Sequence, residues 1–320
     1  MTARCRRMAQ AVLVCVIMVT ELIPAFSNSP LNIAVVLSRE AAPYRHALKG
    51  FEEVLKASGR AYKLQEFSAE GVAVDAAQLA AKIRIRKPDL ILTIGSGATN
   101  MISDEIRDIP VVFSLVLPSS GNESLRGMRE SRGNVTGASM EIPIRTQFAK
   151  LREILPAVRR IGVLYNPDIT GPTVDSAMQT ATSMGLDLVP MQVSSETDLV
   201  TSMDSLSERV DVLWSVADST VFSPAGLKQI LLATLRSRVP FVGLSTSFVK
   251  AGALVAFSVD YQDIGRQSGE LALRILGGDD PSRIPMTVPR SISLSVNMNT
   301  AKQIQVPIHE DIRKKAELYF

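Results

Sequence analysis

The sequence contains few of the residues that usually bind metals or act as nucleophiles. It has 2 cysteines and 2 histidines among 320 residues, and both cysteines, Cys5 and Cys15, lie near the start of the chain. Beyond them the sequence therefore offers no disulfide, no cysteine nucleophile and no thiolate metal site. His46 and His309 are too far apart to follow a metal-ligand spacing, so we predict no bound metal.

Catalytic and nucleotide-binding motifs are also missing. No Gly-x-Ser-x-Gly elbow occurs. The glycine-rich stretch at residues 95–100 lacks the third glycine of a dinucleotide fingerprint and the Gly-Lys-Ser/Thr of a P-loop. The formal net charge is only +3, so nothing indicates the basic face of a nucleic-acid-binding protein. We therefore predict no catalytic activity, no cofactor and no nucleic-acid partner.

Long hydrophobic runs are absent except at the start of the sequence. Residues 8–23 form an apolar run that follows three arginines and precedes Ala25 and Ser27, the small residues of a cleavage site. This order is typical of a secretory signal peptide, here residues 1–27, and predicts a periplasmic protein. The alternative is an uncut membrane anchor, although the run is short for a span of about 20 apolar residues.

The rest of the sequence alternates short apolar runs with longer segments of helical period, which is typical of an α/β fold with parallel sheets. The runs are repeated in type and order: residues 32–37, 88–92 and 109–113 are matched by residues 160–165, 210–214 and 239–243. The first run of each set precedes a helical segment that ends at a glycine, Gly59 or Gly185. We predict two similar doubly wound parallel-sheet lobes joined by a hinge.

The predicted lobes exchange segments near the C-terminus. We expect the first lobe to comprise residues 28–140 and 262–285, and the second lobe residues 141–261 and 286–306. The chain would leave the first lobe after a turn-rich stretch at residues 133–137, and would return to it after a strand that ends at Asp260. We expect residues 307–320 to form a C-terminal helical tail.

The apolar run at residues 90–94 ends in a small polar loop, Ser96, Gly97, Ala98 and Thr99. In parallel α/β sheets, ligands bind beyond the carboxyl ends of the strands. A helix that begins here presents free backbone N–H groups and the positive end of its dipole. We predict that this loop holds a carboxylate or another small anion. The alternative is an ordinary strand–helix turn with a serine N-cap.

The matching loop of the second lobe carries an acid instead of glycine. Asp218 and Ser219 follow the strand at residues 211–216, and we predict that they face the first loop and hold a ligand amine. Asn166 ends another strand and Asp260 lies at the last crossover, so both are further candidates for ligand contact. Each has an alternative, because Asp218 and Asp260 can cap helices and Asn166 can form a turn.

Aromatic residues also lie near strand ends, where a flat ligand would stack on them. They are Tyr44, Phe113, Tyr165 and Trp214. For Phe113 and Trp214 the alternative is a place in the hydrophobic core.

Six stretches of the sequence together resemble the substrate-binding proteins of ABC transporters. They are residues 87–96, 109–113, 133–137, 155–167, 250–254 and 259–265. The resemblance covers roughly residues 32–307, and it implies the type I periplasmic-binding-protein fold. The characterised members of the family include binders of aromatic amino acids.

The resemblance implies that the loop at residues 96–99 binds a ligand carboxylate and that Asn166, Asp218 and Asp260 lie in the cleft. The chain departs from the family pattern at two points. Leu117 stands where the family has an acid, and Ser96-Gly97 stands where it has Thr-Pro. The missing acid leaves two alternatives to an amino acid: a less basic or more apolar solute, or a pocket that no longer binds a ligand.

These observations together predict an exported protein that closes two lobes around a small carboxylate-bearing, amino-acid-like solute. The expected partner is an ABC permease in the membrane, which would receive the solute. The alternative is a sensory module that passes a ligand signal to a membrane receptor or a sensor kinase and transports nothing. An enzyme on the same scaffold is the third hypothesis, and the lack of a nucleophile, base or metal cluster disfavours it.

Overall fold

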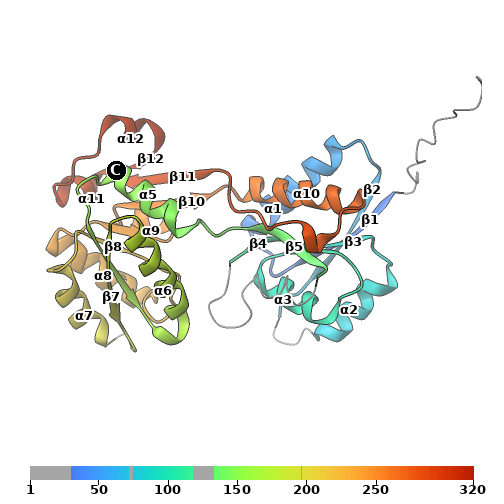
Figure 1. Ribbon diagram of the computed structural model, residues 1–320, viewed down its shortest axis with the longest axis horizontal. Coiled ribbons are helices and arrows are strands. Elements are labelled where there is room, and N and C mark those ends of the chain that lie inside the picture. The colour runs from blue at the N-terminus through green and yellow to red at the C-terminus, as the bar shows by residue number, and fades with distance from the viewer. Residues whose placement is uncertain (1–29, 72–74, 118–132, 196) are drawn as a thin grey trace, which may run out of the picture.

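The chain forms two α/β lobes that lie side by side and are joined by crossing segments (Figure 1). The computed structural model describes residues 30–71, 75–117, 133–195 and 197–320. The predicted signal peptide, residues 1–27, lies outside the described residues, as do Cys5 and Cys15. Among the described residues, no helix combines the length and apolar character needed to cross a membrane.

The first lobe is built on a parallel sheet with strand order β2-β1-β3-β4-β5. Its strands are β1 (Leu31–Leu37), β2 (Tyr62–Ser68), β3 (Leu90–Ile94), β4 (Val111–Val116) and β5 (Val135–Ser139). Its helices are α1 (Ala42–Ala57), α2 (Ala76–Ile85), α3 (Ser96–Glu105) and α10 (Tyr261–Leu276), followed by the 3-10 turn η1 (Pro281–Arg283).

The second lobe is built on a sheet with strand order β12-β11-β10-β9-β8-β6-β7. Its strands are β6 (Arg160–Tyr165), β7 (Asp187–Gln192), β8 (Val212–Trp214), β9 (Phe241–Gly243), β10 (Val255–Val259), β11 (Ile292–Asn297) and β12 (Glu317–Tyr319). Its helices are α5 (Ile144–Ile154), α6 (Pro167–Ser183), α7 (Asp198–Ser207), α8 (Pro224–Ser237), α9 (Thr246–Ala251), α11 (Met298–Gln303) and α12 (Glu310–Lys315). The pairing of β10 with β11 is antiparallel.

The sheet topology confirms the predicted α/β fold of two similar lobes. The order β2-β1-β3-β4-β5 recurs in the second sheet as β7-β6-β8-β9-β10. The three matched sequence runs are the pairs β1 and β6, β3 and β8, and β4 and β9. The apolar runs repeat because corresponding strands occupy corresponding positions in the two sheets.

The composition of the central strands follows from their burial on both faces of a parallel sheet. All five residues of β3, Leu-Ile-Leu-Thr-Ile, are buried. In the first lobe one core packs the sheet against α1 and α10, and another packs it against α2 and α3. The second lobe has the same arrangement, with one core containing side chains of α5 and α6 and another containing side chains of α7 and α8.

Helix α10 begins at the hinge and packs closely on α1 in the first lobe (Figure 1). Gly50 and Gly265 make this close approach possible. A Cβ atom at Gly265 would collide with the carbonyl group of Ala47, and one at Gly50 would collide with the carbonyl group of Gln262. The start of α10 is therefore fixed to the first lobe by backbone-to-backbone contact.

Three segments of chain cross between the lobes. The first joins β5 to α5, the second joins β10 to α10, and the third joins η1 to β11. The third crossing begins along the edge of β5, where the backbone N–H of Ser139 donates to the carbonyl oxygen of Thr287 at 2.9 Å. Short loop connections of this kind are the segments that absorb the backbone rotation when two domains close by a hinge motion.

The C-terminal segment differs from the predicted helical tail. Residues 307–320 form α12 and then β12, which pairs parallel with β11 at the edge of the second sheet. Lys250 lies over the Tyr319 ring at 5.2 Å from its centroid. The three residues of β12 carry too short a pattern to be recognised from the sequence, and pairing with β11 gives their backbone groups partners.

Candidate ligand-binding site

The corner between β3 and α3 has the open backbone that the sequence predicts. Gly95 precedes the helix with a φ of 93°, a conformation that glycine adopts without strain. A Cβ atom at Gly95 would also collide with the Tyr44 ring. The first N–H groups of α3, at Ser96 and Gly97, have no partner among the described residues. The backbone here therefore has two donors available for an anion.

The four residues predicted for this loop take different roles. Ser96 is half-buried and Gly97 is exposed, whereas Ala98 and Thr99 are buried. The backbone N–H of Ala98 donates to Ser38 Oγ at 2.8 Å, and the Thr99 hydroxyl donates to the carbonyl oxygen of Gly95 at 2.9 Å. Ser96 and Gly97 are accessible to a ligand, while Ala98 and Thr99 fix the shape of the corner.

A positive charge lies beside this corner. The Arg39 guanidinium lies over the Tyr44 ring, 5.9 Å from the centroid, and Tyr44 packs against the site of Gly95. Arg39 is exposed and directly follows Ser38, whose hydroxyl caps the same helix turn. The first lobe therefore combines free N–H groups with a nearby cation, which favours a negatively charged ligand group.

The corresponding corner of the second lobe is closed by its own side chain. Asp218 is 2% exposed. Its Oδ2 accepts from the backbone N–H of Asn166 at 2.7 Å and from the Thr170 hydroxyl at 2.6 Å. Its Oδ1 accepts from the backbone N–H groups of Thr220 at 3.0 Å and Val221 at 3.3 Å. Both carboxylate oxygens are thus occupied within the lobe, and the predicted ligand contact of Asp218 stays a prediction.

The other candidates of the second lobe lie near Asp218. Asn166 is the N-cap of α6, where its side chain accepts from the N–H of Asp168 at 3.0 Å and donates to Thr220 Oγ1 at 3.0 Å. Ser219 is exposed next to Asp218. Asn166 and Asp218 therefore belong to one hydrogen-bonded corner, with Ser219 on its outer side.

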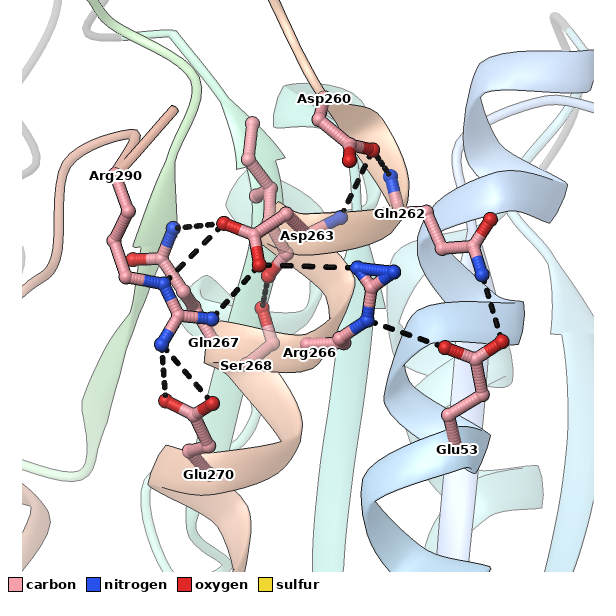
Figure 2. Close-up of polar contacts among 10 residues, drawn as sticks. Glu53, Asp260, Gln262, Asp263, Arg266, Gln267, Ser268, Glu270 and Arg290 are labelled. Atoms are coloured by element: carbon pink, nitrogen blue, oxygen red, sulfur yellow. Dashed lines mark hydrogen bonds and ion pairs between the residues drawn. The ribbon is translucent and has the colours of Figure 1, made fainter. Parts of the chain in front are cut away.

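Asp260 lies at the second crossing and caps α10 (Figure 2). Its Oδ1 accepts from the backbone N–H groups of Gln262 at 2.9 Å and Asp263 at 3.1 Å. The capping that the sequence offered as an alternative is therefore present, and the residue remains exposed.

Charged residues tie the third crossing to the same helix (Figure 2). Arg290 donates to Asp263 at 2.9 Å and to Glu270 at 3.0 Å, and these acids raise the pKa of the Arg290 guanidinium. Arg266 in turn donates to Glu53 of α1 at 3.2 Å. Two crossings are thus anchored on the first lobe through α10.

A cavity of about 290 Å³ lies at the carboxyl edge of the second sheet, beside the crossings. The ends of β8, β9 and β10 supply Ser215, Ser245 and Ser258 to its wall, and α6 supplies Thr170 and Thr173. Its apolar surface includes Met140, Ile142, Trp214, Val242 and Phe257. Leu117 of the first lobe and Tyr261, the first residue of α10, also line it. Its volume is near the lower end of ligand pockets, which range from about 300 to 1,000 Å³.

Trp214 is held in place against this cavity. Its indole N–H donates to Gln147 Oε1 at 2.9 Å, and the Gln147 amide donates to the carbonyl oxygen of Ile142 at 2.8 Å. Its ring meets Phe148 edge-on at 5.2 Å between centroids. Trp214 therefore belongs both to the core, where it is 3% exposed, and to the cavity wall.

Of the described residues that line the cavity, Glu141 is the one with a carboxylate side chain. It belongs to the first crossing, and its backbone N–H donates to Ser139 Oγ at 3.0 Å. Its carboxylate makes no hydrogen bond or ion pair with the described part of the chain. Burial raises the pKa of this carboxyl because it removes water from the charged form.

The sequence predicted none of the cavity-lining polar residues, although it singled out Trp214 as a possible aromatic wall. None of the eight predicted residues is among the residues that line the cavity. Thr170 links the cavity to the predicted set, because it lines the cavity and its hydroxyl donates to Asp218. Glu141 stands in a sequence with no other signal of a site, Met-Glu-Ile-Pro. Among the described residues, no cluster of acids and histidines is arranged to hold a metal ion.

Known proteins resemble this chain over most of its length. A Clostridioides difficile tyrosine-binding protein is 24% identical over 286 residues, covering 88% of this chain and 82% of that protein. An uncharacterized Rickettsia prowazekii protein is 22% identical, covering 93% of this chain and 92% of that protein.

Solved structures share the fold. The ligand-free, open structure of a Clostridium difficile substrate-binding protein with adhesive properties has a TM-score of 0.75 at 20% identity, covering 90% of this chain and 98% of that chain. A Streptococcus pneumonia ABC domain in complex with L-Trp has a TM-score of 0.62 at 22% identity, covering 91% of this chain and 100% of that chain. The family model for the ABC transporter substrate binding protein matches residues 31–319. This chain therefore belongs to the ABC transporter substrate-binding protein family.

Proposed function

We propose that this protein captures a small carboxylate-bearing, amino-acid-like solute between its lobes and delivers it to an ABC permease. The observation that carries the proposal is the cavity of about 290 Å³ beside the crossings, lined by both lobes. Ligands of open α/β sheets bind beyond the carboxyl ends of the strands, which is where this cavity lies. Its volume suits a single amino acid better than a dinucleotide or an oligosaccharide.

The two lobes offer complementary parts of the grip. In the first lobe, the N–H groups of Ser96 and Gly97 hold the ligand carboxylate, with Arg39 nearby. The second lobe provides an apolar wall for the rest of the solute, and Asn166, Asp218, Ser219 and Asp260 surround it at the corners. Hinge closure then brings the two sets of contacts onto one molecule.

Relatives of this chain include a tyrosine-binding protein and a domain crystallised with L-Trp, which makes aromatic amino acids the first solutes to test. Thermal-shift measurements of the purified protein with the L-amino acids, small organic acids and nucleobases test the proposal. We expect an aromatic L-amino acid to raise the melting temperature, because a ligand present at 100 times its Kd stabilises the native state by about 2.7 kcal/mol. Binding of nucleobases alone would contradict it.

Delivery to a permease is tested separately, in cells. We expect a deletion of this protein to abolish uptake of the solute that binds, and a plasmid copy to restore it. Normal uptake in the deletion strain, with binding intact, would instead favour the sensory role and direct the search toward a membrane receptor or sensor kinase.

A further inference from the structure

The described part of the cavity wall carries a negatively charged side chain but no positively charged one. Of the described residues that line it, Glu141 carries the one acidic side chain, and no lysine or arginine is among them. Most of the remaining surface comes from apolar and hydroxyl-bearing side chains. A carboxylate in such surroundings is poorly solvated, and a protein normally pairs it with a cation or with several donors.

Within the described part of the chain, Glu141 has no such pairing, in contrast to Asp218. The Asp218 carboxylate accepts four hydrogen bonds from its own lobe and has no free position for an ammonium group. The Glu141 carboxylate accepts none from the described residues, and its place on the first crossing keeps it at the cavity wall. A structural acid would resemble Asp218, and an acid that waits for a ligand would resemble Glu141.

The backbone fixes where Glu141 leaves the first lobe. β4 and β5 are neighbours, and the N–H of Met140 donates to the carbonyl oxygen of Val116 at 3.0 Å. Leu117 and Glu141 therefore leave adjacent strands at the same edge of the first sheet, and both line the cavity. Leu117 gives its share of the wall no charge, so the acid at this edge comes from the crossing itself.

We propose that Glu141 binds the ammonium group of the solute and selects amine-bearing over amine-free carboxylates. The inference rests on the proposed function, since it assigns the amine end of the solute that the first lobe holds by its carboxylate. An N–H···carboxylate bond to a charged amine is a strong contact in a poorly hydrated site. Trp214, fixed by Gln147, and Phe257 give the same cavity an apolar wall, so the preferred solute is an amino acid with a large apolar side chain.

The test compares an amino acid with its des-amino analogue in two proteins. Calorimetry gives the Kd of L-tyrosine and 3-(4-hydroxyphenyl)propionate, and of L-tryptophan and indole-3-propionate, for the wild type and Glu141→Gln. We expect the wild type to prefer the amino acid by about 10- to 100-fold and the variant to lose that preference, because the amide cannot form an ion pair. The Kd of the des-amino analogue should stay the same in both proteins.

Two further variants separate charge from folding. Glu141→Asp keeps the charge and should restore part of the preference. Glu153→Gln removes an acid from the exposed side of α5 and should leave the preference at its wild-type value. The melting temperature of each ligand-free variant shows whether it folds.

Each outcome decides the question. A preference that survives in Glu141→Gln overturns the assignment of Glu141 and leaves amino-acid binding intact. A wild type that binds the des-amino analogues as tightly as the amino acids also overturns it. A wild type that binds none of the four compounds overturns the proposed function for aromatic amino acids and this inference together.

Discussion

The two lobes share a strand order but differ at the corner after their third strand. After β3, the first lobe has glycines, free N–H groups and space beside Arg39. After β8, the second lobe has Asp218, whose carboxylate takes up the N–H groups of Asn166, Thr220 and Val221. One corner thus leaves its donors without a partner among the described residues, while the other satisfies them internally. A duplicated topology therefore does not imply identical corners, because one side chain decides whether the backbone donors are satisfied.

The largest expected change is a loss of folding stability when the Asp218 carboxylate is removed from the corner of the second lobe. Asp218→Ala removes the acceptor of four hydrogen bonds and leaves buried donors unsatisfied, so we expect a loss of about 3 kcal/mol in the free energy of unfolding. Urea unfolding of the ligand-free protein measures it. Asp218→Asn keeps one acceptor oxygen and should lose less. An unchanged stability with weaker amino-acid binding would instead assign Asp218 to direct ligand contact.

A smaller change, in ligand affinity, should follow when a methyl group is added at Gly97 in the corner of the first lobe. A Cβ atom at Gly97 meets Ser38 Oγ at 3.5 Å, an ordinary contact, so Gly97→Ala should change the free energy of unfolding by no more than about 1 kcal/mol. The added methyl group hinders the approach of a carboxylate to the backbone donors, and we expect an increase of about tenfold in the Kd of L-tyrosine or L-tryptophan. Calorimetry and urea unfolding of the same preparation check both values. Unchanged affinity would place the carboxylate elsewhere.

The smallest expected change is a dependence of ligand affinity on pH, caused by Glu141 in the cavity wall. Burial raises the pKa of Glu141 above its ordinary value of 4.5 in the empty protein. Folding therefore favours the protonated form of Glu141. The contribution of this group to the free energy of unfolding is fully present below its unfolded-state pKa, and it is lost as the pH rises through its folded-state pKa. Ammonium binding needs the ionised form, so affinity should change in the opposite direction and fall as the pH falls through the same range.

The pH effect is measured as the ratio of Kd values for an aromatic amino acid at about pH 5 and about pH 7, where we expect a change of no more than about threefold. Tyr261 is the other titratable side chain among the described lining residues. The comparison protein is Glu141→Gln, in which the ratio should return to about one. An equal ratio in both proteins would assign the effect to groups outside the cavity.

The fold was predictable in more detail than the site. The runs at residues 32–37 and 160–165 predicted β1 and β6, because a strand buried on both faces must be apolar along its whole length. The corner at Ser96 and Gly97 was predictable as well, since it is local: a strand end, a glycine and a helix start lie within a few residues.

The cavity was not predictable, because its wall is assembled from the ends of strands, from the helices α5 and α6 and from the crossings. Nothing near Glu141 in the sequence indicates that its carboxylate finds no partner among the described residues, and nothing near Asp218 indicates that four donors surround it. Both acids follow a strand and look alike in sequence. Their difference depends on neighbours far away along the chain, such as Asn166 for Asp218.

The sequence by itself determined the duplicated α/β architecture and the open glycine corner, because strand burial and backbone freedom depend on residues close together in the chain. The tertiary structure alone decided which acid is satisfied and which faces a cavity, and it also joined β12 to the edge of the second sheet. Whether a buried charge finds hydrogen-bond or ion-pair partners depends on the groups that the fold brings around it. That arrangement is defined only once β8, β9, β10 and the crossings have come together.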